Sequence, residues 1–214
     1  MIRDWQHVFF DFDGVLVTSA MVKVEAFVKA AELLAGKDFA QKLDHAIDHE
    51  LLGAERVVIA DWVFKKTGGK VAQEDFLRTF VKILHESEGK IQFTEGCEDF
   101  LDLLGKKKIP FSIISAAPRG DILEHLKRLG MDSGLFREIS GSEQGKKTEI
   151  LKQTLQDEGL EPGLCVYFGD MPSDAKAAGA CGVPFIRIRS PLGERCAWPE
   201  GDWEVYANFR EILT

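Results

Sequence analysis

The stretch that decides the fold is VFFDFDGV, at residues 8–15. Its apolar run stops at two aspartates, Asp11 and Asp13, which are followed by Gly14. A short apolar run that ends in acidic and glycine residues is typical of the first, buried strand of a parallel α/β sheet. We therefore predict a strand over residues 8–10, with both carboxylates at its carboxyl end.

Further apolar runs, separated by amphipathic stretches, follow along the chain. The expected strands are 109–115, 164–168 and 184–188, with a weaker candidate at 135–139, and the expected helices are 97–105, 121–129 and 147–155. Strand–helix alternation with short connections indicates an α/β fold with a doubly wound, Rossmann-like parallel sheet. Near the end of the chain we expect Trp198 and Trp203 to anchor a loop onto the core, before a short helix that begins near Phe209.

Residues from about 21 to 88 carry helical periodicity and no convincing strand. Apolar residues recur every four positions in two series, Phe39, Leu43, Ile47 and Leu51, then Phe76, Phe80 and Leu84. This spacing predicts about four helices. We expect them to form a helical domain over 18–91, inserted into a core made of 1–17 and 92–214.

The composition excludes several classes of protein. The 214 residues include 27 basic and 35 acidic ones, a net charge of −8, which is unlike a nucleic-acid binder or a protein held on anionic lipid. No apolar run approaches the ~20 residues of a membrane span, and the first residues lack a signal-peptide layout. Four scattered cysteines contain no C-x-x-C pair. We expect a cytoplasmic monomer without nucleic-acid or membrane partners.

Polar residues follow the ends of several predicted strands, where ligands gather in doubly wound sheets. They are Asp11 and Asp13, Ser115, Asp170 with Asp174 four residues on, and the lysines at 146 and 147 that precede a helix. Two carboxylates ~4 Å apart repel each other by about 4 kcal/mol at an effective dielectric constant of about 20. An acidic cluster with only oxygen ligands therefore predicts a hard divalent cation, and a neighbouring phosphate suits Mg²⁺.

These segments resemble the four motifs of the haloacid dehalogenase superfamily of phosphohydrolases. Residues 8–15 are similar to its D-x-D-G-[TV] signature, and residues 169–180 to its G-D-x-x-x-D…A-x-x-A-G motif. Ser115 matches the second motif and Lys147 the third, with Lys146 as the alternative. The helical insertion resembles the small cap of the subgroup that includes phosphoglycolate phosphatase and β-phosphoglucomutase.

The resemblance implies a role for each aspartate. Asp11 is the expected nucleophile, which forms an aspartyl-phosphate, and Asp13 the expected general acid and then general base. Mg²⁺ would be bound by Asp11, the backbone carbonyl oxygen of Asp13 and Asp170. Asp174 would position the ligands or a bound water, although a charge effect at a helix N-terminus is an alternative for this residue.

The resemblance also implies residues that bind the substrate, a small phosphorylated metabolite. Ser115, the amide of Ala116 and Lys147 would bind and orient the phosphate. Arg56 follows a glycine-containing stretch where the subgroup often has a loop between cap helices, so it would meet the leaving group. A solvated helix end is the alternative for Arg56.

The resemblance implies a Mg²⁺-dependent phosphatase of small phosphate monoesters, with a sugar phosphomutase as the alternative. A dehalogenase would need neither Asp13 nor a metal, and a phosphonate hydrolase would need a Schiff-base lysine such as Lys23. A non-enzymatic phospho-aspartate switch also uses aspartate, Mg²⁺, serine or threonine, and lysine. Receiver domains of that kind are shorter, however, and lack both the motif at 169–174 and a helical insertion.

Overall fold

The computed structural model describes residues 4–214 and divides into two compact units. One unit ends at Thr18 and resumes over Gln92–Thr214, and the other is Ser19–Ile91. Thr18 and Gln92, the two residues of the first unit that flank Ser19–Ile91, are hydrogen-bonded to each other. The Thr18 amide donates to the Gln92 carbonyl at 2.9 Å, and the Gln92 amide donates to Thr18 Oγ1 at 3.1 Å. Over residues 4–214, no helix is both long enough and apolar enough to cross a bilayer.

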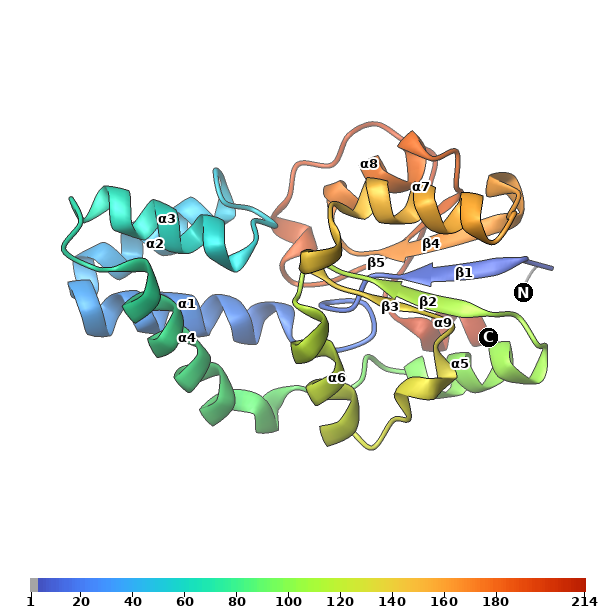
Figure 1. Ribbon diagram of the computed structural model, residues 1–214, viewed down its shortest axis with the longest axis horizontal. Coiled ribbons are helices and arrows are strands. Elements are labelled where there is room, and N and C mark those ends of the chain that lie inside the picture. The colour runs from blue at the N-terminus through green and yellow to red at the C-terminus, as the bar shows by residue number, and fades with distance from the viewer. Residues whose placement is uncertain (1–3) are drawn as a thin grey trace. The chain divides into compact units, whose positions relative to one another are not determined.

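The first unit is built on a parallel sheet (Figure 1). Within the described residues it has six strands, in the order β3-β2-β1-β4-β5-β6. They are β1 (His7–Phe10), β2 (Phe111–Ile114), β3 (Ile139–Ser140), β4 (Cys165–Gly169), β5 (Phe185–Ile188) and β6 (Glu204–Tyr206), and every pairing is parallel. The order reverses beside β1, so the carboxyl ends of β1, β2 and β4 meet at the place where such sheets bind ligands.

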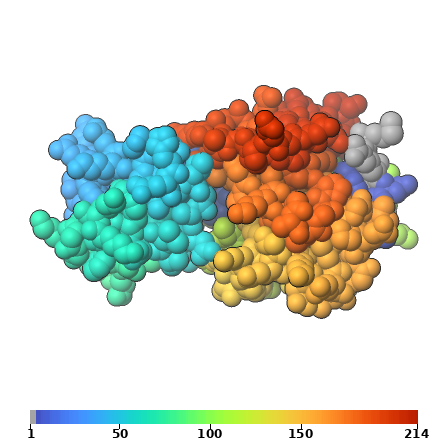
Figure 2. All heavy atoms as spheres, turned by 90° about the horizontal axis from the view of Figure 1, so that it is seen from above, coloured from blue at the N-terminus to red at the C-terminus, as the bar shows by residue number. Residues whose placement is uncertain are grey.

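Helices cover both faces of this sheet because successive side chains of a strand point to opposite sides. On one face, Phe9 and Tyr167 pack with apolar residues of α7 (Lys147–Asp157) and α8 (Pro172–Ala180). Figure 2 shows this face, where the gold and orange atoms of the segments that carry α7 and α8 cover the sheet. On the other face, Phe10 and Phe168 contact Phe100 of α5 (Cys97–Lys106), and they also contact the ring of Phe209 in α9 (Phe209–Leu213).

The predicted α/β fold is confirmed, with two local errors. The weak strand predicted at 135–139 begins only at Ile139, because residues 133–135 form a 3-10 helix in which Asp132 accepts a hydrogen bond from the Gly134 amide at 2.9 Å. The segment after Trp203 is not among the predicted strands, but it forms β6 at the edge of the sheet. Trp203 does pack on Phe185, with ring centroids 5.8 Å apart.

The second unit, Ser19–Ile91, is helical. It contains α1 (Ala20–Ala35), α2 (Lys37–Asp48), α3 (Arg56–Lys66) and α4 (Gln73–Ser87), followed by a 3-10 turn at Glu88–Lys90. The predicted apolar series of α4 faces inward: Phe76 and Phe80 are buried, and both rings stack on Phe27 of α1. The four helices expected in this stretch are therefore present.

Candidate active site

Asp11 lies directly after β1, and its position is fixed by both backbone and side chain. Its amide donates to the Phe168 carbonyl at 2.9 Å, which continues the pairing of β1 with β4. Carboxylate Oδ1 accepts the Phe12 amide at 2.7 Å, and Oδ2 lies 2.9 Å from Lys147 Nζ. The residue is only 5 % exposed. Asp11 therefore presents a buried, oriented carboxylate at the carboxyl edge of the sheet.

A tight turn follows Asp11 and carries the second aspartate. Asp13 is half-buried, and its charge raises the pKa of Asp11, so the two carboxylates lie near one another. Gly14 has a φ of +82°, and its amide donates to the Val17 carbonyl at 2.8 Å. A Cβ at Gly14 would overlap Oδ2 of Asp170. The glycine of the motif is therefore needed both for the turn and for the close approach of the β4 end.

Asp170 and Asp174 come from the connection between β4 and α8. Asp170 follows β4 and is 1 % exposed, whereas Asp174 lies in the first turn of α8 and is fully buried. Asp174 Oδ2 accepts the Met171 amide at 3.0 Å, and Oδ1 contacts Lys147 Nζ at 2.6 Å. Asp174 therefore caps the start of α8 and also belongs to the acidic cluster.

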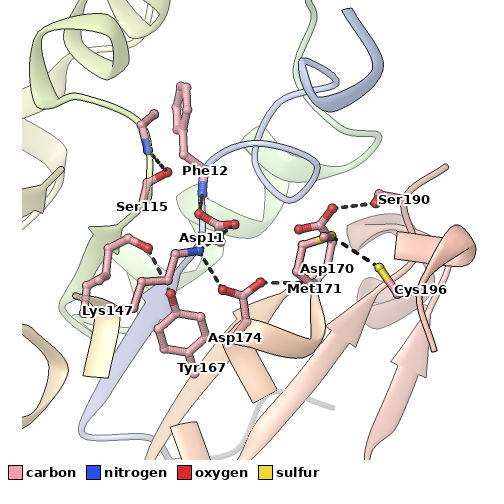
Figure 3. A network of polar contacts seen from close by, with 12 residues as sticks. Asp11, Phe12, Ser115, Lys147, Tyr167, Asp170, Met171, Asp174, Ser190 and Cys196 are labelled. Carbon is pink, nitrogen blue, oxygen red and sulfur yellow. Dashed lines mark hydrogen bonds and ion pairs between the residues drawn. The ribbon is translucent and has the colours of Figure 1, made fainter. Parts of the chain in front are cut away.

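Of the two candidate lysines, the structure brings Lys147 to the aspartates. Its Nζ lies between Asp11 and Asp174 (Figure 3), and the side chain is 14 % exposed. Lys146 is exposed and precedes α7, where its amide donates to Glu149 Oε2 at 3.2 Å. α7 begins at Lys147, where the expected helix 147–155 starts, because Glu149 caps the turn from Lys146.

The other predicted phosphate-binding residues lie in different places. Ser115 follows β2, next to β1 in the sheet, and is 2 % exposed. Its Oγ accepts the Ala117 amide at 3.2 Å, while Ala116 between them is exposed. Arg56 belongs to the Ser19–Ile91 unit, where it is the first residue of α3 rather than part of a loop, since Glu55 has the extended backbone of a helix N-cap.

Burial and mutual repulsion shift the pKa values of the cluster. Burial raises the pKa of Asp11 to about 6, with Asp174 and Asp13 adding to the shift and Lys147 opposing it. Burial, Asp11 and Asp174 together raise the pKa of Asp170 well above its usual range. Burial alone would lower the pKa of Lys147, but Asp11 and Asp174 outweigh it and raise that pKa. The negative charge of the aspartate cluster is therefore larger than the single positive charge of Lys147 can neutralise.

The cluster fits a hard divalent cation. Asp11, Asp170 and Asp174 each contribute a carboxylate oxygen, and these oxygens lie within 4.8 Å of one another. Asp170 Oδ1 is buried and has no hydrogen-bond partner anywhere in residues 4–214. An unpartnered buried oxygen is costly unless a ligand binds it. The oxygens of Asp11 and of Asp174 already have partners, so Asp170 Oδ1 is the oxygen of the cluster that remains for an ion.

Two residues of this network were missed from the sequence. The hydroxyl of Tyr167 on β4 donates to the Ile114 carbonyl at 2.9 Å, immediately before Ser115. The hydroxyl of Ser190 lies 2.5 Å from Asp170 Oδ2. Ser190 comes two residues after the predicted strand 184–188. It could have been found as a polar residue that follows the end of a predicted strand, as Asp11, Ser115 and Asp170 were. Nothing in the sequence pattern distinguishes Tyr167 from an ordinary apolar strand residue.

Known proteins resemble this chain over nearly its whole length. A family model described as haloacid dehalogenase-like hydrolase matches residues 8–188. The chain is 27 % identical over 193 residues to a phosphorylated carbohydrates phosphatase of Thermotoga maritima, covering 84 % of this chain and 82 % of that protein. It is 26 % identical over 217 residues to a phosphoglycolate phosphatase of Synechococcus elongatus, covering 98 % and 97 %. Its fold matches that of CbbY from Rhodobacter sphaeroides in complex with phosphate, with a TM-score of 0.77 at 16 % identity, over 97 % and 96 % of the two chains.

Proposed function

The chain belongs to the haloacid dehalogenase-like hydrolase family, and from that premise we propose that it is a Mg²⁺-dependent phosphatase acting on small phosphate monoesters. The observation that carries the proposal is the buried cluster in which Lys147 bridges Asp11 and Asp174 beside an unpartnered oxygen of Asp170. The names of the two curated relatives, both phosphatases, support the same reaction class.

Asp11 is the proposed nucleophile. The Phe12 amide and Lys147 hold its two oxygens, so the carboxylate is oriented before substrate binds. A carboxylate oxygen attacks phosphorus, the bond between phosphorus and the ester oxygen breaks, and an aspartyl-phosphate forms. With a pKa of about 6, Asp11 is mostly ionised at neutral pH, as a nucleophile must be.

Asp13 is the proposed proton carrier. It is half-buried on the turn after Asp11, so part of its surface is open to solvent. Asp13 gives its proton to the departing ester oxygen, and its carboxylate then takes a proton from water. The water oxygen bonds to phosphorus, and the bond to Asp11 breaks. Inorganic phosphate and free Asp11 are the products, so the enzyme is ready for another cycle.

The remaining residues hold the transferring group. Mg²⁺ bound by Asp11, the carbonyl oxygen of Asp13 and Asp170 would offset the charge of the phosphate. Lys147 and Ser115, with the amide of Ala116, bind the phosphate oxygens, and Asp174 keeps Lys147 in place.

The helical unit is the proposed substrate-selecting cap. It is inserted between the first and second motifs of the sequence, and Arg56 at the start of α3 supplies a cation for an anionic or hydroxylated leaving group. All four cysteines are free thiols, which supports a cytoplasmic location. The proposed partners are small phosphorylated metabolites, without nucleic acid or membrane, and the proposed state is a monomer.

The test is hydrolysis of p-nitrophenyl phosphate with Mg²⁺ and with EDTA. We expect turnover only with the metal, and a loss of about 10³-fold or more in kcat for Asp11→Asn. Asp102→Asn, at an exposed position on α5, is the matched control and keeps wild-type activity. Full activity of Asp11→Asn would refute the nucleophile.

The alternative, a sugar phosphomutase, shares the first step but returns the phosphoryl group to a sugar hydroxyl. It predicts that a sugar monophosphate is isomerised, and that a bisphosphate is required for turnover. Release of inorganic phosphate from monoesters without a bisphosphate favours the phosphatase.

A further inference from the structure

The two carboxylate oxygens of Asp170 have different surroundings (Figure 3). Oδ2 accepts a hydrogen bond from the Ser190 hydroxyl, with 2.5 Å between the oxygens. Oδ1 is buried and has no hydrogen-bond partner in the part of the chain that the structure describes. One oxygen is therefore held by Ser190, and the other remains for a ligand.

The direction of the hydrogen bond from Ser190 is set by a second contact. Ser190 is 4 % exposed, and its Oγ accepts the Gly193 amide at 2.9 Å. The single hydroxyl proton is then left for Asp170, which as a carboxylate only accepts. Ser190 thus connects the loop backbone to Asp170 through one oriented hydroxyl.

The loop that carries Ser190 is fixed to the sheet. The Gly193 carbonyl accepts the indole N–H of Trp198 at 2.9 Å and an N–H of Arg187 at 3.4 Å. The guanidinium group of Arg187, on β5, lies 3.9 Å from the ring centroid of Trp198. Both backbone groups of Gly193 are therefore engaged, and Ser190 has a rigid support.

Close packing confines the pair formed by Asp170 and Ser190. A Cβ at Gly14 would overlap Asp170 Oδ2 and lie 3.3 Å from the Cβ of Ser190. A Cβ at Gly193 would overlap the backbone carbonyl oxygen of Asp170. The Asp170 side chain therefore has little room to rotate while its bond to Ser190 is made.

We propose that Ser190 is a positioning residue, which holds Asp170 so that Oδ1 faces the divalent cation. The inference rests on the proposed function, because it takes Asp170 as a ligand of that ion. Outer hydrogen bonds to metal ligands typically contribute 10- to 100-fold to metal affinity. Ser190 itself touches neither substrate nor the reacting atoms in this role.

The test measures Mn²⁺ binding to the whole protein by the electron paramagnetic resonance signal of the free ion. Ser190→Ala should weaken Mn²⁺ binding about tenfold, and Ser190→Cys, which keeps the shape but donates only weakly, should weaken it several-fold. Ser112→Ala is the matched control: Ser112 is also buried and hydrogen-bonded, to His7 Nε2 at 2.9 Å, and we expect affinity within about twofold of wild type. Urea unfolding in EDTA checks that each variant is folded.

Turnover gives a second readout. In Ser190→Ala the Mg²⁺ concentration for half-maximal activity should rise about tenfold, while kcat at saturating Mg²⁺ stays within about threefold of wild type. Wild-type Mn²⁺ affinity in Ser190→Cys, or an equal loss in Ser112→Ala, would overturn the proposal, and Ser190→Cys decides the matter if the alanine variant does not fold.

Asp170→Asn separates this inference from the function on which it rests. If Asp170→Asn binds Mn²⁺ as tightly as wild type, the metal site of the proposed function is wrong. If that variant loses the ion and the Ser190 variants keep it, only the role of Ser190 is wrong.

Discussion

At the scale of single residues, the ammonium group of Lys147 partly neutralises the negative charge of the aspartate cluster. It lies 2.9 Å from Asp11 Oδ2 and 2.6 Å from Asp174 Oδ1, with 14 % of its side chain exposed. Breaking a buried ion pair by removing one partner typically costs 3–5 kcal/mol, because the other charge is left without compensation. We therefore expect Lys147 to contribute several kcal/mol to the stability of the protein without metal.

Lys147→Met should lower the free energy of unfolding by about 3 kcal/mol in urea at pH 8 with EDTA. The loss should be smaller at pH 5, since the raised pKa values of Asp11 and Asp170 let these carboxyls take up protons. Lys146→Met, at the exposed neighbouring position, is the control and should change stability by less than about 0.5 kcal/mol. Equal effects of the two substitutions would contradict this account.

A second residue couples stability to pH. His7 is buried at the start of β1, and burial lowers its pKa to about 4, against an opposing effect of Glu158. The unfolded chain has a histidine pKa of about 6.5, so between pH 6.5 and 4 it binds more protons than the folded one. The contribution of His7 is complete above pH 6.5 and falls by about 3 kcal/mol as the pH drops to 4.

His7→Gln removes this titration and keeps a polar group toward Ser112, whose Oγ lies 2.9 Å from His7 Nε2. Urea unfolding from pH 7.5 to 4 should show a shallower loss of stability in the variant than in wild type. The raised pKa of Asp11 acts in the opposite direction, favouring the folded state as the pH falls, but it is common to both proteins. Parallel pH profiles would show that His7 is not the group responsible.

At the scale of elements, the end of β4 lies directly against the first turn of α8. A Cβ at Gly169 would overlap the Cβ of Asp174, whereas at Gly179, further along α8, a Cβ would meet none of the described neighbouring atoms within 4 Å. The close approach of β4 to Asp174 therefore requires glycine at position 169. No such contact requires glycine at position 179.

Gly169→Ala should lower the free energy of unfolding by about 1–3 kcal/mol, since overpacking forces the backbone to shift. Gly179→Ala should raise it by up to about 1 kcal/mol, because Gly179 lies in the last turn of α8 and alanine has the higher helix propensity. Thermal or urea unfolding in EDTA measures both changes. Tolerance of alanine at position 169 would contradict the close approach of Gly169 to the Asp174 side chain.

At the scale of the whole molecule, the proposed ion links distant parts of the chain. Asp11 and Asp170 are 159 positions apart in sequence, yet β1 and β4 are neighbours in the sheet. An ion that binds only the folded protein stabilises it by about 2.7 kcal/mol at 100 times its Kd. Mg²⁺ should therefore raise the unfolding temperature, and EDTA should lower it.

In Asp170→Asn this response to Mg²⁺ should be lost, while Asp102→Asn keeps it. Scanning calorimetry at matched ionic strength makes the comparison, because salt alone also screens the net charge of −8. An unchanged response in Asp170→Asn would remove that residue from the ion site.

Some strands could be predicted from the sequence and others could not, depending on how strong their apolar pattern is. The four central strands were found because buried parallel strands are continuous apolar runs. The edge strand β6 was not, since its three residues are exposed or half-buried and carry no such run. Likewise, the 135–139 candidate starts in a 3-10 turn, because the Gly134 amide bonds to the Asp132 side chain and the Leu135 and Phe136 amides bond to the carbonyls of residues 132 and 133.

The sequence by itself determined the α/β class, the family resemblance and the identity of the clustered aspartates, because each depends on local runs and fixed spacings. Only the tertiary structure decided which lysine contacts them and how Asp170 is held. Lys147 rather than Lys146 reaches Asp11 because α7 begins there, and Ser190 meets Asp170 because β5 lies beside β4. Contacts between segments far apart in sequence depend on strand order and helix starts, and no short stretch of residues encodes those.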